Sequence, residues 1–301
     1  MASIAAPSAD HGARSASRRL REFGGLLLLL PAPLGWLIFF YLIPLVVLLI
    51  HAFWSVDYLT IQRSFTLDNF RTLLGNELYS RVLVRTVAIA ALVTVADLVL
   101  AFPIAYFLAK RVKKHRELLL LLVIFPLWSS YLVRVFAWKT ILGTNGILNS
   151  FLLNVGLIDQ PVTAFLYSKT AMFLTFCQVW LPFMILPLFT VLDRMPNSII
   201  EAASDLGSSW WQTLRRIVIP LALPGILAGS LSVFSLTLGD FITPTLLGGP
   251  GDQMIGRLVA DNFGMSNNWP LGATLIIPIL ILISIFIGVA NRFGALGRTG
   301  E

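Results

Sequence analysis

The side chains best suited to bind a cation are those of two aspartates that lie within apolar segments. Asp97 lies near the centre of a long apolar run, where a charge costs roughly 2.5 to 3.5 kcal/mol on insertion scales and usually faces a cavity or a partner. Asp240 lies near the end of another run. Gly239 before it and Pro244 after it suggest a broken helix end that opens on a cavity.

Each polar or aromatic residue in these segments also has a purely structural interpretation. Asp97 could be neutral or hydrogen-bonded between helices, and Arg134 could pair with an acidic residue or extend to the interface along its flexible stem. The rings of Trp128, Trp180 and Phe241 could contact a cation through their π faces. Aromatic residues are also common near membrane interfaces, so both interpretations stay open.

No arrangement for covalent chemistry accompanies these residues. None of the lysines follows a glycine, so the Gly-Lys-Ser/Thr loop that cradles phosphates is absent from the sequence. His11, His51 and His115 are too scattered to hold a metal or to activate a nucleophile. The single cysteine, Cys177, excludes an internal disulfide and a cysteine-based metal cluster. The sequence therefore predicts no catalytic residue, metal or cofactor.

The elements that must position these residues are apolar helices. The 301 residues are 57% hydrophobic and 12% charged, with a mean hydropathy of +0.83, a composition typical of membrane proteins. A helix needs about 20 apolar residues to cross a bilayer, and strand-like alternation is absent. The sequence thus predicts an all-α membrane protein with six transmembrane helices. The apolar windows are residues 25–52, 86–108, 118–138, 171–192, 219–241 and 271–290.

The distribution of lysine and arginine predicts the orientation. Loops rich in these residues stay on the cytoplasmic side. With a cytoplasmic amino terminus, that side holds 14 of them and the outside 7, so both termini are predicted to be cytoplasmic. The net charge of +7 is explained by this topology rather than by nucleic-acid binding. The first apolar run is 28 residues long, too long for a signal peptide, and it is predicted to be an anchor.

The apolar runs divide the chain into four parts. Residues 1–22 are rich in Ala, Ser and Arg and are predicted to form a disordered cytoplasmic tail. Residues 23–80 hold the first span and an outer connector. Residues 81–292 form a domain with a five-helix core, which includes a charged loop at 193–219. Residues 293–301 form a second cytoplasmic tail.

Two short helices are expected in the charged loop. Ser198 and Glu201 have the spacing of a capping box, so a helix should begin there, and Gly207 can end it. Ser209 and Gln212 repeat the spacing and should begin the second helix. The loop should therefore be helix, glycine turn, helix.

The first of these helices combines acidic and small side chains. Glu201 and Asp205 lie on one face, where they could meet a cationic partner. Ala202 and Ala203 would permit the close approach of another surface. A helix tucked under the bilayer as a simple surface element is the alternative, and residue properties alone do not separate the two.

The loop resembles the signature loop of type I ABC importer permeases. That pattern is Glu-Ala-Ala, three residues, Gly, nine residues, then Ile-x-Leu-Pro, and Ile219 departs from it by replacing the usual leucine. Residues 126–149, 238–250 and 254–273 are further similar to the permease subunits of spermidine/putrescine importers and their opine-type relatives. The residues that match the loop pattern are Glu201, Ala202, Ala203, Gly207, Ile217 and Pro220.

The resemblance implies a permease with a six-helix fold in a bacterial inner membrane. Its loop would be the coupling helix that docks on a cytosolic ATPase dimer, so ATP would be hydrolysed by a separate subunit and this chain would be no enzyme. A second, non-identical permease and a periplasmic solute-binding protein would complete the assembly. The transported solute would be a small cation such as spermidine or putrescine, with an opine or an amino-acid-like solute as the alternative.

Two other functions are compatible with parts of the sequence. An ion-coupled secondary transporter would use Asp97 as its proton or sodium site and would need no ATPase. A membrane scaffold or sensor would use the helix at 201–207 only to recruit a cytosolic protein. Neither explains the similarity in the outer loop and the fifth span.

Overall fold

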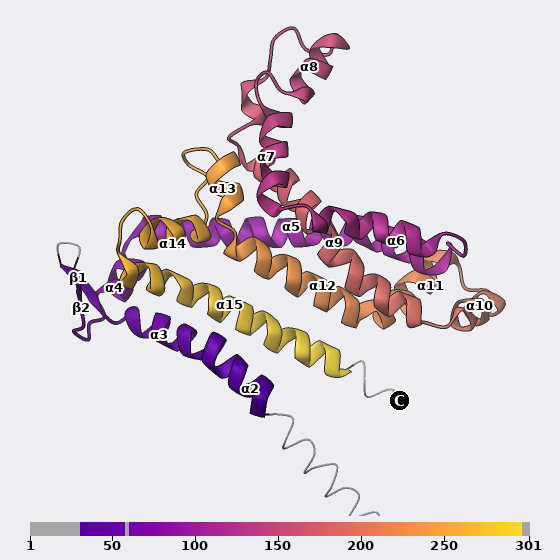
Figure 1. Ribbon diagram of the computed structural model, residues 1–301. Coiled ribbons are helices and arrows are strands. Elements are labelled where there is room, and N and C mark those ends of the chain that lie inside the picture. The colour runs from indigo at the N-terminus through magenta and orange to yellow at the C-terminus, as the bar shows by residue number, and fades with distance from the viewer. Residues whose placement is uncertain (1–30, 58–59, 297–301) are drawn as a thin grey trace, which may run out of the picture. The chain divides into compact units, whose positions relative to one another are not determined.

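The computed structural model describes residues 31–57 and 60–296, and within these ranges the chain is almost entirely helical (Figure 1). Chain contacts divide it into two units, residues 1–52 and 53–301. The expected tail at 1–22, the start of the first span and the last five residues of the second tail lie outside the described residues.

The described part of the first unit, residues 31–52, is a single helical run. Helix α2 (Pro31–Leu37) continues through a π-helical segment (Ile38–Leu42) into α3 (Ile43–His51). Pro44, near the start of α3, cannot donate a backbone hydrogen bond, which is consistent with the irregular turn just before it. The run is long and apolar enough to cross a membrane, as predicted for the first span.

The second unit opens with a small connector. Strand β1 (Ser55–Asp57) pairs antiparallel with β2 (Thr60–Gln62), and the short helix α4 (Asp68–Gly75) follows. Asn76 then caps α5 (Glu77–Lys110), because its side chain accepts a hydrogen bond of 2.9 Å from the backbone N–H of Leu78.

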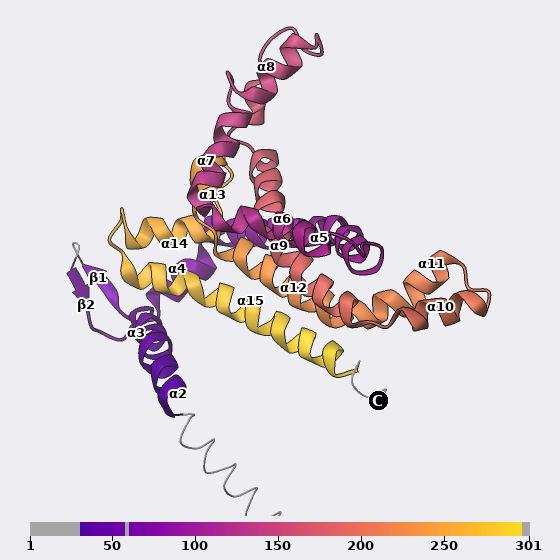
Figure 2. The same ribbon diagram turned by 45° about the vertical axis from the view of Figure 1, so that its right-hand side comes forward.

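Three long helices form the centre of this unit. Helices α5, α9 (Lys169–Arg194) and α12 (Ile219–Gly239) pack against one another in pairs (Figures 1 and 2). Gly225 permits the close approach of α12 to α9, since a Cβ there would lie 2.8 Å from the carbonyl oxygen of Pro187. Helix α15 (Trp269–Leu296) packs on α12 and on α14 (Ile255–Phe263).

The predicted third span is not one continuous helix, and that prediction was wrong. Residues 118–138 are divided between α6 (Arg116–Ile124) with a 3₁₀ turn (Phe125–Trp128) and α7 (Tyr131–Leu142). The two parts meet at an angle of 88°. Pro126 lacks a backbone donor, and Ser129 and Ser130 adopt extended backbone angles that end the helix.

Shorter elements complete the unit. They are α8 (Ile147–Asn154), a 3₁₀ turn (Thr163–Phe165), α10 (Asn197–Asp205), α11 (Trp210–Thr213), a π-helical segment (Leu214–Val218) and α13 (Ile242–Leu247). In the described residues five helices are long and apolar enough to span a membrane, or six if the bent pair counts as one span. This result agrees with the predicted fold class.

Candidate functional site

The charged loop lies at one end of the second unit, beyond the ends of α5, α9 and α12. Figures 1 and 2 both show α10 and α11 there, with α4 and α14 at the opposite end. Gly207 turns the chain between the two helices at a φ of +78°, a left-handed conformation that glycine adopts without strain. The expected order of helix, glycine turn, helix is therefore what the structure contains.

The two predicted caps had different outcomes. The Ser209 hydroxyl accepts the Gln212 N–H at 3.3 Å and the Gln212 side chain accepts the Ser209 N–H at 3.0 Å, so this capping box is confirmed. The box at Ser198 is wrong. Helix α10 begins at Asn197, so its cap position is Pro196, two residues before the predicted cap, and no side chain caps it.

The side chains of α10 are mostly exposed. Glu201, Ala202 and Asp205 lie on the surface, and Leu206 just after the helix is 87% exposed. Ala203 differs, since it is buried against the rest of the unit. The helix therefore presents carboxylates and a large apolar side chain outward and is attached through its small buried face.

Two polar contacts fix the chain just before α10. The Lys110 ammonium group donates to the carbonyl oxygen of Met195, and the guanidinium of Arg116 pairs with Asp193. Arg116 also lies 4.9 Å from the ring centre of Phe189. The end of α5 and the start of α6 are thus joined to the segment that leads into the loop.

A second group of polar residues gathers where α7, α9 and α13 meet. The Tyr131 hydroxyl donates to a carboxylate oxygen of Asp240 and lies 2.6 Å from the Thr243 hydroxyl. The other Asp240 oxygen accepts the backbone N–H of Ile242 at 2.8 Å and that of Thr243 at 3.4 Å. Asp240, one residue before the N-cap Phe241, therefore accepts from the first two backbone N–H groups of α13 and from Tyr131.

Trp180 and Arg134 belong to the same group. The rings of Trp180 and Tyr131 stack with centres 5.2 Å apart, and Arg134 lies 6.0 Å above the Tyr131 ring. Arg134 also donates to the carbonyl oxygen of Val179 at 3.3 Å. The structure therefore brings three predicted site residues, Arg134, Trp180 and Asp240, into one polar junction.

Asp97 lies apart from this junction. Its side chain is fully buried within the helix packing, and neither carboxylate oxygen has a hydrogen-bond partner among the described residues. Cys177 on α9 is close enough to interact with it, but a thiol is only a weak donor. A buried carboxyl group without partners is costly, so its position calls for an explanation.

The remaining predicted residues do not join either group. Trp128 and Phe241 are 74% and 48% exposed. Phe241 directly follows Asp240 and lies in the N-cap position of α13, but its ring makes no described contact with the junction. Ile217 lies in the π-helical segment and Pro220 in the first turn of α12, where a missing N–H costs little.

Sequence reasoning did not select Tyr131 and Thr243. The Tyr131 hydroxyl and the backbone N–H of Thr243 both donate to Asp240. A signal for Tyr131 existed, because it follows Ser129 and Ser130 in an otherwise apolar run. Such a polar pair marks the break that turns α7 toward α13.

Comparison with known proteins identifies the family. Residues 101–295 match the family described as binding-protein-dependent transport system inner membrane component. The chain is 39% identical to the inner membrane ABC transporter permease protein YdcU of Escherichia coli K12, over 90% of each chain. It is 38% identical to the spermidine/putrescine transport system permease protein PotB of the same strain, over 86% of this chain and 94% of PotB.

Solved structures show the same fold. A chain of a bacterial alginate ABC transporter, solved in complex with an alginate pentasaccharide-bound periplasmic protein, superposes with a TM-score of 0.71 at 16% identity, over 94% of this chain and 99% of that one. With this fold and the family match over most of its length, the chain belongs to the inner membrane components of binding-protein-dependent transport systems, the permease subunits of ABC importers.

Proposed function

We propose that this permease forms half of the pathway by which an ATP-driven importer moves a small cationic solute, of the polyamine class represented by spermidine and putrescine. The observation that carries the substrate class is the identity of 38% to PotB over 94% of that permease. An opine or amino-acid-like solute is the competing cargo. It also carries an ammonium group, so the same carboxylates and aromatic rings could bind it.

The exposed surface of α10 supports docking on a separate ATPase. Glu201 and Asp205 offer charge to a cationic groove, Leu206 offers an apolar side chain, and Ala202 permits close approach. The buried Ala203 attaches the helix to the rest of the unit and Gly207 permits its turn, while Ile217 and Pro220 lie in the segment that leads into α12. Since the sequence carries no Gly-Lys-Ser/Thr motif, ATP is bound and hydrolysed by two cytosolic subunits.

The pathway itself is assigned to the intramembrane polar residues. Asp97 and Asp240 supply negative charge to a polyamine, and Trp128, Trp180 and Phe241 supply π faces. The carboxylate of Asp240 becomes available only when the Tyr131 contact opens, which suits a pathway that alternates between two states. Arg134 orients Tyr131 and is excluded from direct contact with a cation by its charge.

Because one permease chain forms half of the pathway, the complete transporter needs further subunits. A second, homologous but distinct permease forms the other half, and a periplasmic binding protein delivers the solute. Residues 81–292 form the transport domain with the coupling loop at 193–219, residues 23–80 add the first span and connector, and the tails at 1–22 and 293–301 lie in the cytoplasm.

Reconstitution tests this function. The chain is placed in vesicles with its ATPases, second permease and binding protein, and ATP hydrolysis and uptake are measured with spermidine, putrescine, an opine and an amino acid. We expect the polyamines to stimulate both activities, and a non-hydrolysable ATP analogue to stop uptake. Uptake without ATP would indicate a secondary transporter instead, and stimulation by the opine alone would overturn the substrate class.

A further inference from the structure

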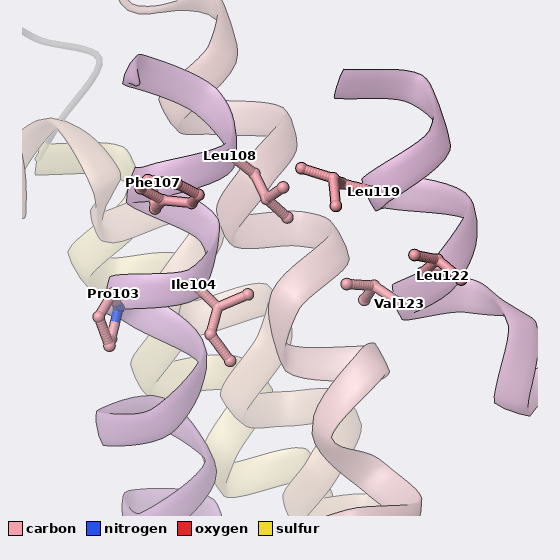
Figure 3. A pocket seen from close by; sticks show the side chains of 7 residues that line it. All are labelled: Pro103, Ile104, Phe107, Leu108, Leu119, Leu122 and Val123. Carbon is pink, nitrogen blue, oxygen red and sulfur yellow. The ribbon is translucent and has the colours of Figure 1, made fainter. Parts of the chain in front are cut away.

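An apolar groove lies between α5 and α6, on residues that the proposed pathway does not use. Its volume is about 530 Å³. Figure 3 shows Ile104 and Leu108 of α5 extending toward Leu119 and Val123 of α6. Every lining side chain is apolar, and Leu122 at its edge is 60% exposed. The groove is therefore open and suited to a hydrocarbon chain.

Cationic side chains stand at the end of this groove. The loop 111–115 joins its two walls and carries the exposed Lys113 and Lys114. Arg111 in the same loop is also exposed but lines a separate pocket beside α10 and α11. In the part of the chain that the structure describes, no ion pair or side-chain hydrogen bond engages these three residues. Glu117, the nearest acidic residue in sequence, is exposed and has no such partner either.

We propose that the groove is a binding site for an anionic phospholipid. One acyl chain lies between α5 and α6, and the phosphate of the headgroup contacts Lys113 and Lys114. The loop joins the ends of two apolar helices, which is the depth at which headgroups lie in a bilayer. Basic pockets between transmembrane helices bind anionic headgroups by this combination of apolar walls and cationic rim.

The lipid would also steady the coupling loop. The loop is flanked by Lys110, the last residue of α5, and Arg116, the first of α6, which bind Met195 and Asp193 just before α10. A headgroup that immobilises loop 111–115 therefore restricts the segment through which the coupling helix is attached. This site is independent of which solute is transported.

Lipid retention measures the site directly. The transporter is purified through a tag on the full chain, equilibrated with equal amounts of phosphatidylglycerol and phosphatidylcholine, and examined by native mass spectrometry for lipids that stay bound. We expect the wild type to retain phosphatidylglycerol. Lys113→Gln with Lys114→Gln should weaken its retention roughly 30-fold, from the attraction expected of two cations near an anionic headgroup.

A second variant and two matched controls separate the groove from general effects. Leu122→Trp should displace the acyl chain and lower retention even with both lysines present. Leu92→Trp is the control for it, because Leu92 is 57% exposed on α5 but lies outside the groove. Arg292→Gln removes another exposed cation, from α15, and should leave retention unchanged.

Three results would overturn the proposal. The first is equal retention of the two lipids by the wild type. The second is an equal effect of Arg292→Gln, which would indicate general attraction to an anionic surface. The third is a loss of the second permease in the Leu122→Trp preparation with lipid retention intact, which would make the groove a helix interface. None of these measurements involves ATP or polyamine. A result that overturns the lipid site therefore leaves the proposed transport function untouched, and the reverse is also true.

Discussion

The two intramembrane carboxylates are in opposite states. Asp240 accepts bonds from Tyr131 and from two backbone N–H groups, whereas both oxygens of Asp97 lack a partner among the described residues. When a substitution removes the partner of a buried polar group, that group stays buried without a hydrogen bond and the protein is destabilised. A substitution at a carboxyl group that has no partner leaves no such group behind. The same substitution, Asp to Asn, should therefore act differently at the two positions.

At Asp97, substitution by Asn should lower uptake without lowering stability. Asn keeps the shape of the side chain and removes a carboxyl group whose ionised form costs roughly 2.5 to 3.5 kcal/mol at this depth on insertion scales. Uptake of spermidine in vesicles and thermal unfolding in detergent measure the two effects. Normal uptake together with a lower unfolding temperature would mean that Asp97 only holds helices together.

At the junction, Tyr131→Phe should destabilise the protein by about 1 to 3 kcal/mol, because it leaves a buried Asp240 oxygen without its donor. Thr243→Val is the comparison variant, since it removes the hydroxyl 2.6 Å from that of Tyr131 but keeps the Tyr131 hydroxyl as a donor to Asp240, and it should cost less. Thermal unfolding of the two variants provides the comparison. An unfolding temperature unchanged by Tyr131→Phe would contradict the proposed capping network.

Among the helices, the sequence predicted the long spans and the loop better than the breaks. Spans appear as apolar runs whatever they pack against, and Ser209 with Gln212 makes a local cap that needs no tertiary contact. The break near Ser129 and Ser130 has local causes such as Pro126, but the direction of α7 after it is accompanied by the contact of Tyr131 with Asp240, more than a hundred residues away. The start of α10 depends on the backbone of Pro196, which competes with the cap expected at Ser198.

Helix α10 should fail as a coupling element when its charge is reversed. Glu201 is exposed and near Asp205, so Glu201→Lys would face a cationic groove on the ATPase, and like-charge contacts at an interface cost several kcal/mol. We expect uptake to fall at least about tenfold, with the permease still present in the membrane. Glu201→Gln is the control and should be less affected, and uptake at the wild-type rate in the Lys variant would refute this role.

The contact between α9 and α12 should be sensitive to a single methyl group. In Gly225→Ala the new Cβ would lie 2.8 Å from the Pro187 carbonyl oxygen and 3.1 Å from the Leu188 Cα, so the backbone must shift. Overpacking of this kind costs about 1 to 3 kcal/mol. Gly239→Ala in the same helix meets nothing within 4 Å and should be nearly neutral in thermal unfolding. Equal stability of the two variants would contradict close packing at Gly225.

For the molecule as a whole, the two ends of α5 define two sides of the membrane. Arg85 donates to the carbonyl oxygens of Gly251 and Gln253, and Lys110 donates to that of Met195. The rise of an α-helix puts roughly 37 Å between Arg85 and Lys110, more than the hydrocarbon thickness of about 30 Å. The loop 248–254 and the coupling loop therefore lie on opposite sides.

The excess of lysine and arginine beside the coupling loop predicts which side is the cytoplasm. Green fluorescent protein, which fluoresces when it folds in the cytoplasm, should be bright when fused after residue 301 or inserted between Lys113 and Lys114. Alkaline phosphatase, active only outside, should be active when inserted between Gly251 and Asp252. The reverse pattern would invert the topology, and it would also remove α10 from any cytosolic ATPase, because α10 is joined to Lys110 and Arg116 through Met195 and Asp193.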